Sequence, residues 1–489
     1  MTLGGRAFWL ACGAAYVLMA VAYWPTTQLA PIALDDVSSL EQLSQASFGQ
    51  IFDYDRFGHL RPLKSALFWV LSRHPEWLSA WRVLALGCVL AAAGLGQVLC
   101  ARLSLGRGWA LAVAVCWVAN PITASVLCWL STANLAICLL GMLAYLYFAE
   151  RSVAAAALSL LVAVFSHELG VVAPVLWLAY HGSANRKLLL ASGLCIAAWA
   201  LLLLTHDAPA SQYRVSGPLA LHAPWFLFEN LRLWFWLPGR FGVLLAEPAV
   251  SSWIVALCWI ALIAAVALWW RLRGRDPVLD FAVCWCACLL LPLVNFVPIG
   301  NTPVALHYLF LPGFGLALAL VRAAQRLGSA LPALALGVLI TAWLPEQRRT
   351  LAAWSGAEAL YTASHSNYPE NVEVRVNLIA SYLDQKKYSQ ARALLLESRQ
   401  LAPQDAALIL NQFKLLAETG EAEAALALLP ELVGKLSPDE RFHAAYRVAI
   451  ELVQAQQYAR AKALVDRLLL EFPDRPELLL SKRLLAGAR

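Results

Sequence analysis

The feature that most constrains this chain is the division of its 489 residues into a long apolar part and a shorter polar part. Residues 1–345 consist of apolar runs separated by short charged joints, whereas residues 346–489 have the composition of a soluble helical segment. Only 14% of all residues are charged, compared with roughly 25% in a typical soluble domain. The first part therefore predicts a membrane domain, and the second part predicts a water-soluble domain.

Several apolar runs approach the roughly 20 residues that are needed to cross the ~30 Å hydrocarbon layer of a membrane. They are residues 7–24, 79–101, 188–204, 252–270, 278–297, 308–321 and 329–344, with four shorter runs between residues 109 and 180 that are broken at Asn120-Pro121, at Glu150-Arg151 and at Ser166-His167-Glu168. Together they predict an all-α, polytopic transmembrane domain of about eleven spans.

Basic residues concentrate in alternate joints between the predicted spans. They are Arg102 and Arg107, Arg151, Arg186 and Lys187, Arg271, Arg273 and Arg275, and Arg322 and Arg326. Because basic joints mark the cytoplasmic side, we expect the C-terminal domain on the opposite side. The expected location is a bacterial inner membrane, with the C-terminal domain in the periplasm. The net charge of +6 follows from these joints, so no nucleic-acid partner is expected.

Residues 372–480 repeat with a period of about 35 residues, which is typical of tetratricopeptide repeats. Successive units end near Pro403, Pro438 and Pro473, and carry a small residue at equivalent positions, Ala391, Ala425 and Ala461. The pattern predicts a tetratricopeptide-like α-solenoid over residues 372–489, after a linker at 346–371. Two roles stay open for it: binding of a protein or peptide on its concave face, and a docking cap that only stabilises the membrane domain.

The predicted first outer loop gathers ionisable residues. Asp35 and Asp36 follow the first span directly, and a carboxylate at that place can act as a general base toward an acceptor hydroxyl. The alternative for this pair is a solvated, charged loop. Arg61 offers a planar fork that suits a phosphate, and Lys64 and His59 are its basic neighbours in the sequence.

Polar residues reappear where later apolar runs break. Asn134 follows a short polar stretch, His167 and Glu168 separate two apolar runs, and His307 and Tyr308 begin another run. Ionisable residues in membrane segments are usually functional, although an interfacial loop would also explain His167 and Glu168. Because all of these residues are predicted on the outer face, we expect them to converge on one cavity with Asp36.

These motifs, taken together, resemble the GT-C membrane glycosyltransferases over almost the whole chain. The similarity is greatest to the branch with C-terminal tetratricopeptide repeats, which includes the O-mannosyltransferases of cadherins and bacterial relatives. It rests on the acid pair after the first span, on Arg61-Pro62-Leu63, on Pro121-Ile122-Thr123 with Ser131-Thr132-Ala133-Asn134, on Ser166-His167-Glu168 and on His307-Tyr308-Leu309-Phe310-Leu311-Pro312.

The resemblance implies a GT-C-like domain at residues 1–345 that transfers a sugar from a polyprenyl phosphate to an acceptor hydroxyl at the outer face. It assigns the catalytic carboxylate to Asp35 or Asp36. The leaving phosphate would be stabilised by Arg61, Lys64 and His307, with Tyr308 beside them. The family often has Lys where this chain has His167, and Arg where it has His307, which points to a different donor sugar.

The expected partners are the lipid-linked sugar, membrane lipid, and a protein or glycan acceptor such as a pilin in the outer compartment. No metal is expected, and no cofactor besides the lipid-linked donor. Two other functions stay open. A non-catalytic scaffold, whose repeats recruit envelope proteins, predicts that the outer acids are dispensable. A transporter of lipid-linked sugars would usually show internal repeats among its spans, and the sequence shows none.

Overall fold

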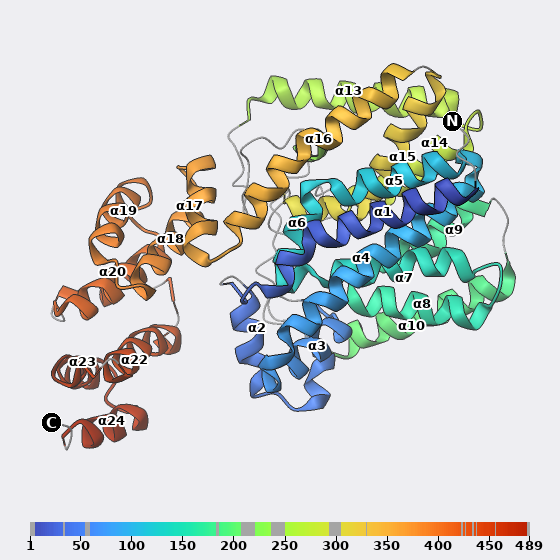
Figure 1. The fold of residues 1–489 in the computed structure, drawn as a ribbon. Helices are drawn as coiled ribbons and strands as arrows, with labels where there is room; N and C mark the ends of the chain where they lie inside the picture. The colour runs from blue at the N-terminus through green and yellow to red at the C-terminus, as the bar shows by residue number, and fades with distance from the viewer. Residues whose placement is uncertain are drawn as a thin grey trace. The chain divides into compact units, whose positions relative to one another are not determined.

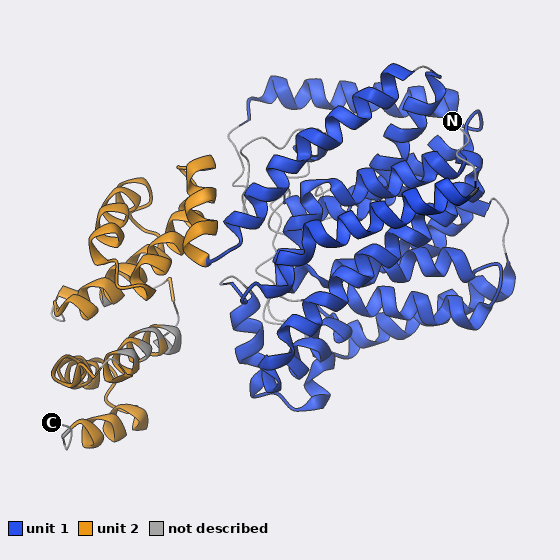
Figure 2. Ribbon diagram, viewed as in Figure 1, with its two compact units in different colours: residues 1–356 blue, residues 357–489 orange. Residues whose placement is uncertain are grey.

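The structure, a computed structural model of the chain, is all-α (Figure 1). It describes residues 5–32, 35–53, 59–181, 185–206, 221–235, 250–292, 305–328, 330–421, 424–425, 427–432, 435–436, 438–454 and 456–486. Two compact units divide the chain, residues 1–356 (unit 1) and residues 357–489 (unit 2) (Figure 2).

Unit 1 is a bundle of mostly apolar helices around one buried core. Its α-helices are α1 (Gly5–Tyr23), α2 (Asp35–Ser44), α3 (Pro62–Arg73), α4 (Leu78–Cys100), α5 (Arg107–Ala119), α6 (Pro121–Cys128), α7 (Asn134–Phe148), α8 (Val153–Ser166), α9 (Ala173–His181), α10 (Arg186–Thr205), α12 (Ala223–Phe235), α13 (Ser252–Leu272), α14 (Pro277–Leu290), α15 (Phe310–Arg326) and α16 (Ala330–Ala353). Short 3₁₀ helices join several of them, among which are η2 (Phe48–Phe52), η5 (Leu130–Thr132), η6 (Glu168–Val172) and η7 (Leu306–Leu309).

Seven helical segments in the described residues are long and apolar enough to cross a membrane, and eight if the bent pair α5–α6 counts as one span. They make the chain a membrane-associated protein. The helices α8 and α14 are apolar but shorter. The number of about eleven spans therefore stays a prediction.

The breaks predicted between residues 109 and 180 fall where helices end. Asn120 separates α5 from α6, and its side chain accepts a hydrogen bond from the Ile122 N–H while Pro121 occupies the first helical position. These are favourable choices for a helix start. Ser152 caps α8 in the same way, through the Ala155 N–H. Local capping thus divides this apolar stretch into short helices.

The predicted basic joints meet at one end of unit 1, which we call the basic end. Asp276, at the start of α14, pairs with Arg322 at 2.9 Å and with Arg326 at 2.7 Å, both at the end of α15. Arg102, after α4, lies 4.0 Å from Glu150, after α7. Gln325, in α15, links the two groups by donating to the Leu105 carbonyl, after α4, at 2.8 Å. These joints thus lie at one end of unit 1, and their side of the membrane stays a prediction.

Unit 2 consists of helical hairpins. Its helices are α17 (Ala357–Asn367), α18 (Val372–Asp384), α19 (Tyr388–Leu401), α20 (Ala406–Thr419), η8 (Leu429–Leu432), α22 (Pro438–Gln454), α23 (Tyr458–Glu471) and α24 (Pro476–Ala486). The predicted linker at 346–371 is largely helical: α16 runs through Pro345 to Ala353, and α17 follows. The helical unit therefore begins earlier than the sequence period indicates.

The period of the repeats is visible in their turns. Lys386, Gly420 and Gln456 all have a positive φ, of 57°, 92° and 61°. In each turn the next residue donates its backbone N–H to a carbonyl five residues back, as in the helix-ending Schellman motif. The three small positions predicted from the sequence, Ala391, Ala425 and Ala461, are fully buried. The same local device thus ends the first helix of three successive units.

Candidate functional site

A bidentate ion pair joins the first predicted outer loop to the end of α8. Arg61, which precedes α3, donates from Nε to Glu168 Oε2 at 2.8 Å and from Nη2 to Oε1 at 2.7 Å. The Arg61 side chain is 12% exposed and that of Glu168 is 24% exposed. The two residues are 107 positions apart in the sequence. This pair is therefore a long-range contact that fixes two loops together.

Glu168 is held in place by the backbone around it. It opens η6 directly after His167, whose extended conformation ends α8. Gly170 lets η6 pack closely on α8, since a Cβ on this residue would lie 2.5 Å from the carbonyl carbon of Ala163. Any larger residue would push η6 outward. The position of the carboxylate thus depends on a glycine two residues later.

Four more ionisable side chains surround this pair, and we call the six residues the ionisable cluster. Its members are His59, Arg61, His167, Glu168, His307 and Tyr308. The charges of His59 and His307 act on His167, and those of Arg61 and Glu168 act on Tyr308. The structure thus brings together residues from three separate stretches of the sequence, as the prediction of one convergent site requires.

The two acid–base groups at the centre of the cluster have opposite charge preferences. Burial lowers the pKa of His167 well below its ordinary value, and the charge of Arg61 lowers it further. Burial alone would raise the pKa of Glu168, but the charge of Arg61 and its hydrogen bond hold that pKa well below its ordinary value. At neutral pH the cluster therefore contains a charged Arg61–Glu168 pair beside a neutral His167.

A neutral His167 has one defined tautomer here. Its Nδ1 accepts a hydrogen bond from the Leu169 N–H at 3.2 Å, so the proton lies on Nε2. The 3.6 Å approach of Nδ1 to Glu168 Oε2 is then not an ion pair. His167 is 5% exposed. Its hydrogen bond to the Leu169 N–H holds the backbone turn in which Glu168 lies.

Asp36 lies on α2 and is fully buried, with 0% exposure. Its Oδ2 accepts from the Leu130 N–H at 3.2 Å and its Oδ1 accepts from the Ser131 N–H at 2.8 Å. An acceptor hydroxyl cannot reach this carboxylate unless the turn at Leu130 moves. Asp36 therefore holds the start of η5 in this structure. The side chain of Asp35, the other predicted base, lies outside the described residues.

Trp129 connects Asp36 to the ionisable cluster. It immediately precedes Leu130, and its ring meets the His307 ring edge-on, with 4.9 Å between centroids. Trp354, at the end of α16, stacks on Trp129 at 5.8 Å. Asp36 and the cluster thus share one end of unit 1, which we call the site end. Because Trp354 lies there too, the chain leaves unit 1 at the site end.

Asn134 supports the site from behind. It is 2% exposed and donates from Nδ2 to the Ser166 carbonyl at 2.7 Å. This bond ties the start of α7 to the end of α8, directly before His167. Within the described residues, its Oδ1 has no hydrogen-bond partner. Asn134 was predicted as a site residue, and the structure gives it a supporting contact.

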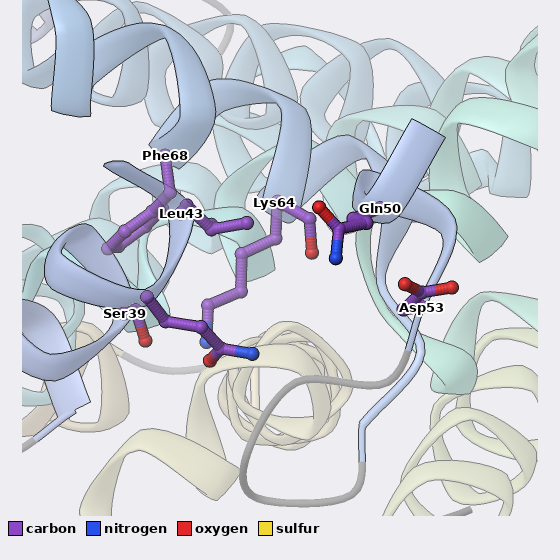
Figure 3. A pocket seen from close by; sticks show the side chains of 8 residues that line it. Ser39, Leu43, Gln50, Asp53, Lys64 and Phe68 are labelled. Carbon is purple, nitrogen blue, oxygen red and sulfur yellow. The ribbon is translucent and has the colours of Figure 1, made fainter. Parts of the chain in front are cut away.

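Lys64 lines a small pocket beside α2. It is 6% exposed and lines a small pocket formed by α2, η2 and α3, with Ser39, Gln42, Leu43, Gln50, Asp53, Ser65 and Phe68 (Figure 3). The Lys64 side chain runs from α3 into this pocket, toward Ser39 (Figure 3). The pocket holds about 20 Å³, roughly the space of one water. The predicted role of Lys64 toward a phosphate stays a prediction.

Arg82 is a residue of the site end that sequence reasoning missed. It lies near the start of α4, is 2% exposed, and donates to the carbonyls of Leu127 and Cys128 at 3.1 and 3.0 Å. The charge of Asp36 acts on it. Arg82 could have been found from its position inside an apolar run of the sequence, because a charged residue is costly there and is usually functional.

The site end supplies polar and ionisable groups at the ends of apolar helices. The Nε and Nη2 atoms of Arg61 both face Glu168, and the predicted role of Arg61 toward a phosphate stays a prediction. The other cluster members besides His167 are the imidazoles of His59 and His307 and the Tyr308 phenol. Among the described residues, no three His, Cys, Asp or Glu side chains gather as metal ligands.

Comparison with protein families matches residues 352–408 to the tetratricopeptide repeat. This match supports the predicted repeats and begins before residue 372, in agreement with the helical stretch that precedes α18. Comparison with curated proteins and with solved structures found no match.

Proposed function

We propose that this chain is a membrane glycosyltransferase that moves a sugar from a polyprenyl phosphate to an acceptor hydroxyl at the site end. The ionisable cluster, centred on the Arg61–Glu168 ion pair, is the observation that carries this proposal. Charged groups are costly in an apolar helical unit unless they are paired or functional. The residues of the cluster are also those that carry the resemblance to the GT-C glycosyltransferases.

In the proposed reaction, the acceptor oxygen attacks the anomeric carbon of the donor, and the bond from that carbon to the phosphate oxygen breaks. The acceptor proton passes to a carboxylate. Of the acid pair, Asp35 is the better candidate for this base, because Asp36 is fully buried and bonded to two backbone N–H groups. In this proposal, His307 and Tyr308 would interact with the leaving phosphate.

The proposed location is a bacterial inner membrane, with the site end and the repeats on the periplasmic side. This orientation follows from the clustering of Arg322, Arg326 and Arg102 at the basic end. The proposed acceptor is an exported protein, since tetratricopeptide repeats generally bind proteins. Attachment of the repeats to the same chain would raise the local concentration of a bound acceptor.

The proposal is tested by intact-mass comparison of envelope proteins and glycolipids from cells with and without the gene. The expected result is a mass difference of one or more sugar residues on an exported protein. Cells that carry Glu168→Gln should resemble cells without the gene. If both the deletion and Glu168→Gln leave every glycan intact while envelope assembly fails in the deletion alone, the chain is a scaffold.

A further inference from the structure

The turn between α6 and η5 is held by two buried groups of opposite charge. Arg82 donates from Nη1 to the carbonyls of Leu127 and Cys128, and from Nη2 to the Ala30 carbonyl at 3.1 Å. On the other side of the turn, Asp36 accepts from two backbone N–H groups. These five hydrogen bonds all join the two charged side chains to main-chain atoms. The pair therefore fixes the path of the backbone.

Trp129 occupies the middle of this turn. Within the described stretch from Asn120 to Leu139, every residue except Trp129 is buried, and Trp129 is half-buried. One neighbour is the Trp354 ring, inclined by 30°, and another is the His307 ring, which meets it at 81°. An indole that is half-buried between such rings has a fixed orientation. The side chain that the charge pair positions is thus the one that faces outward.

The use of two buried charges for one turn needs a reason. A helix end can be capped by a neutral side chain, as Asn120 does at the start of α6. Buried charges carry a desolvation penalty, and they are best attested where they fix a specific arrangement. Here the arrangement that they fix is the position of an aromatic ring beside the ionisable cluster.

We propose that Trp129 is a substrate-contacting residue that packs against the sugar ring of the lipid-linked donor, and that Arg82 is its positioning residue. The proposal rests on the proposed function for the type of ligand. A hexose ring has an apolar C–H face that packs on an indole and hydroxyl groups that need polar partners. Trp129 offers an apolar face and the neighbouring His307 offers a polar group. A prenyl chain would use only the apolar face.

The binding experiment does not depend on catalysis. Purified full-length protein in nanodiscs is titrated with two probes, a polyprenyl phosphate and the same lipid phosphate carrying a hexose, and the ratio of the two affinities isolates the contribution of the sugar. Wild-type protein is expected to prefer the hexose-bearing lipid. Trp129→Ala should reduce this preference roughly 3–10-fold, the usual range for an aromatic packing contact, and Trp129→Phe should retain most of it.

The positioning role of Arg82 is tested by asking whether the effect of its substitution requires Trp129. Arg82→Lys keeps the charge but loses the planar fork, and should lower the hexose preference in the same direction. Because Arg82 acts through Trp129, the double variant Arg82→Lys/Trp129→Ala should show no loss beyond Trp129→Ala alone. Arg322→Lys, which alters an ion pair at the basic end, is the matched control and should keep the wild-type ratio.

Three results would overturn the inference: equal affinity of the wild-type protein for both lipids, an unchanged preference in Trp129→Ala, or additive losses in the double variant. If the wild-type protein prefers the hexose-bearing lipid through Trp129 but transfers no sugar, the inference stands and the proposed function fails. If transfer occurs but Trp129→Ala keeps the donor KM, the proposed function stands and the inference fails.

Discussion

Separate removal of Arg61 and Glu168 tests whether the ion pair acts as one unit. We expect Arg61→Leu and Glu168→Leu each to destabilise the protein, because each leaves the other charge buried without its partner. The double variant Arg61→Leu/Glu168→Leu removes both charges and places apolar groups in their stead. It should therefore be more stable than either single variant.

The magnitude follows from the geometry of the pair. Removal of one member of a buried pair costs about 3–5 kcal/mol, and the 24% exposure of Glu168 favours the lower end of this range. We expect a loss of about 3 kcal/mol for each single variant, and of at most about 1 kcal/mol for the double variant. The pair should thus couple by about 5 kcal/mol in a double-mutant cycle.

The cycle also has a defined dependence on pH. Arg61 lowers the pKa of His167, so its loss should raise that pKa and let a protonated His167 pair with Glu168, whose carboxylate lies 3.6 Å away. The destabilisation in Arg61→Leu should therefore shrink between pH 8 and pH 6. In Glu168→Leu the remaining positive charge of Arg61 keeps His167 neutral, and no such recovery is expected.

The measurement is thermal and denaturant unfolding of the full chain in one detergent, with sugar transfer assayed on the same preparations. The exposed pair Arg392–Glu421, with side chains 53% and 46% exposed, is the matched control and should couple by less than about 1 kcal/mol. The double variant should regain stability without transfer. A double variant as unstable as the sum of the single variants would refute the interpretation that burial makes this pair a unit.

Further outcomes are expected for other variants. His167→Asn should make the free energy of unfolding less dependent on pH below 6.5. In the wild-type protein the pKa of His167 is lowered by folding, so the unfolded chain binds a proton on His167 at a pH where the folded chain does not, and the folded state loses stability as the pH falls. Identical pH profiles for the variant and the wild type would contradict this. Asp36→Asn should lower the free energy of unfolding by about 1.5–3 kcal/mol, because the new amide N–H₂ would face a backbone N–H. Asp35→Asn should cut sugar transfer roughly 10²–10⁴-fold, and full transfer in this variant would show that Asp35 is not the base. Lys386→Gly should stabilise the full chain by up to about 1 kcal/mol in denaturant unfolding, because φ is 57° there. Leu396→Cys, on the repeats and 66% exposed, should react with an impermeant maleimide added outside the cell; reaction only after lysis would reverse the proposed topology.

Helix positions and the repeat period were predictable because they depend on local patterns. Asn120 and Ser152 end one apolar helix and start the next by bonding their own neighbours, and the turn residues of the repeats recur with the sequence period. The continuation of α16 through Pro345 was not predictable. Proline usually ends a helix, and no sequence signal placed the end of α16 at Ala353.

The sequence predicted which residues belong to the site better than it predicted the contacts between them. The ends of apolar runs drew attention to Asp36, Glu168 and His307, and these ends meet in the fold. Which partner each residue selects depends on long-range packing that a single sequence does not contain. The pairing of Arg61 with Glu168 was therefore not predicted, and Arg82 escaped attention because no motif surrounds it.

The salt bridges of the basic end also bear on how the protein is inserted into the membrane. Asp276 precedes its partner Arg322 by 46 residues, so its carboxylate is synthesised first and cannot form this ion pair until α15 has followed. In the proposed topology, Arg322 and Arg326 would carry their charge to the cytoplasmic side and pair with Asp276 only once α14 and α15 pack together. The same residues would then direct insertion first and fasten the finished helices afterwards.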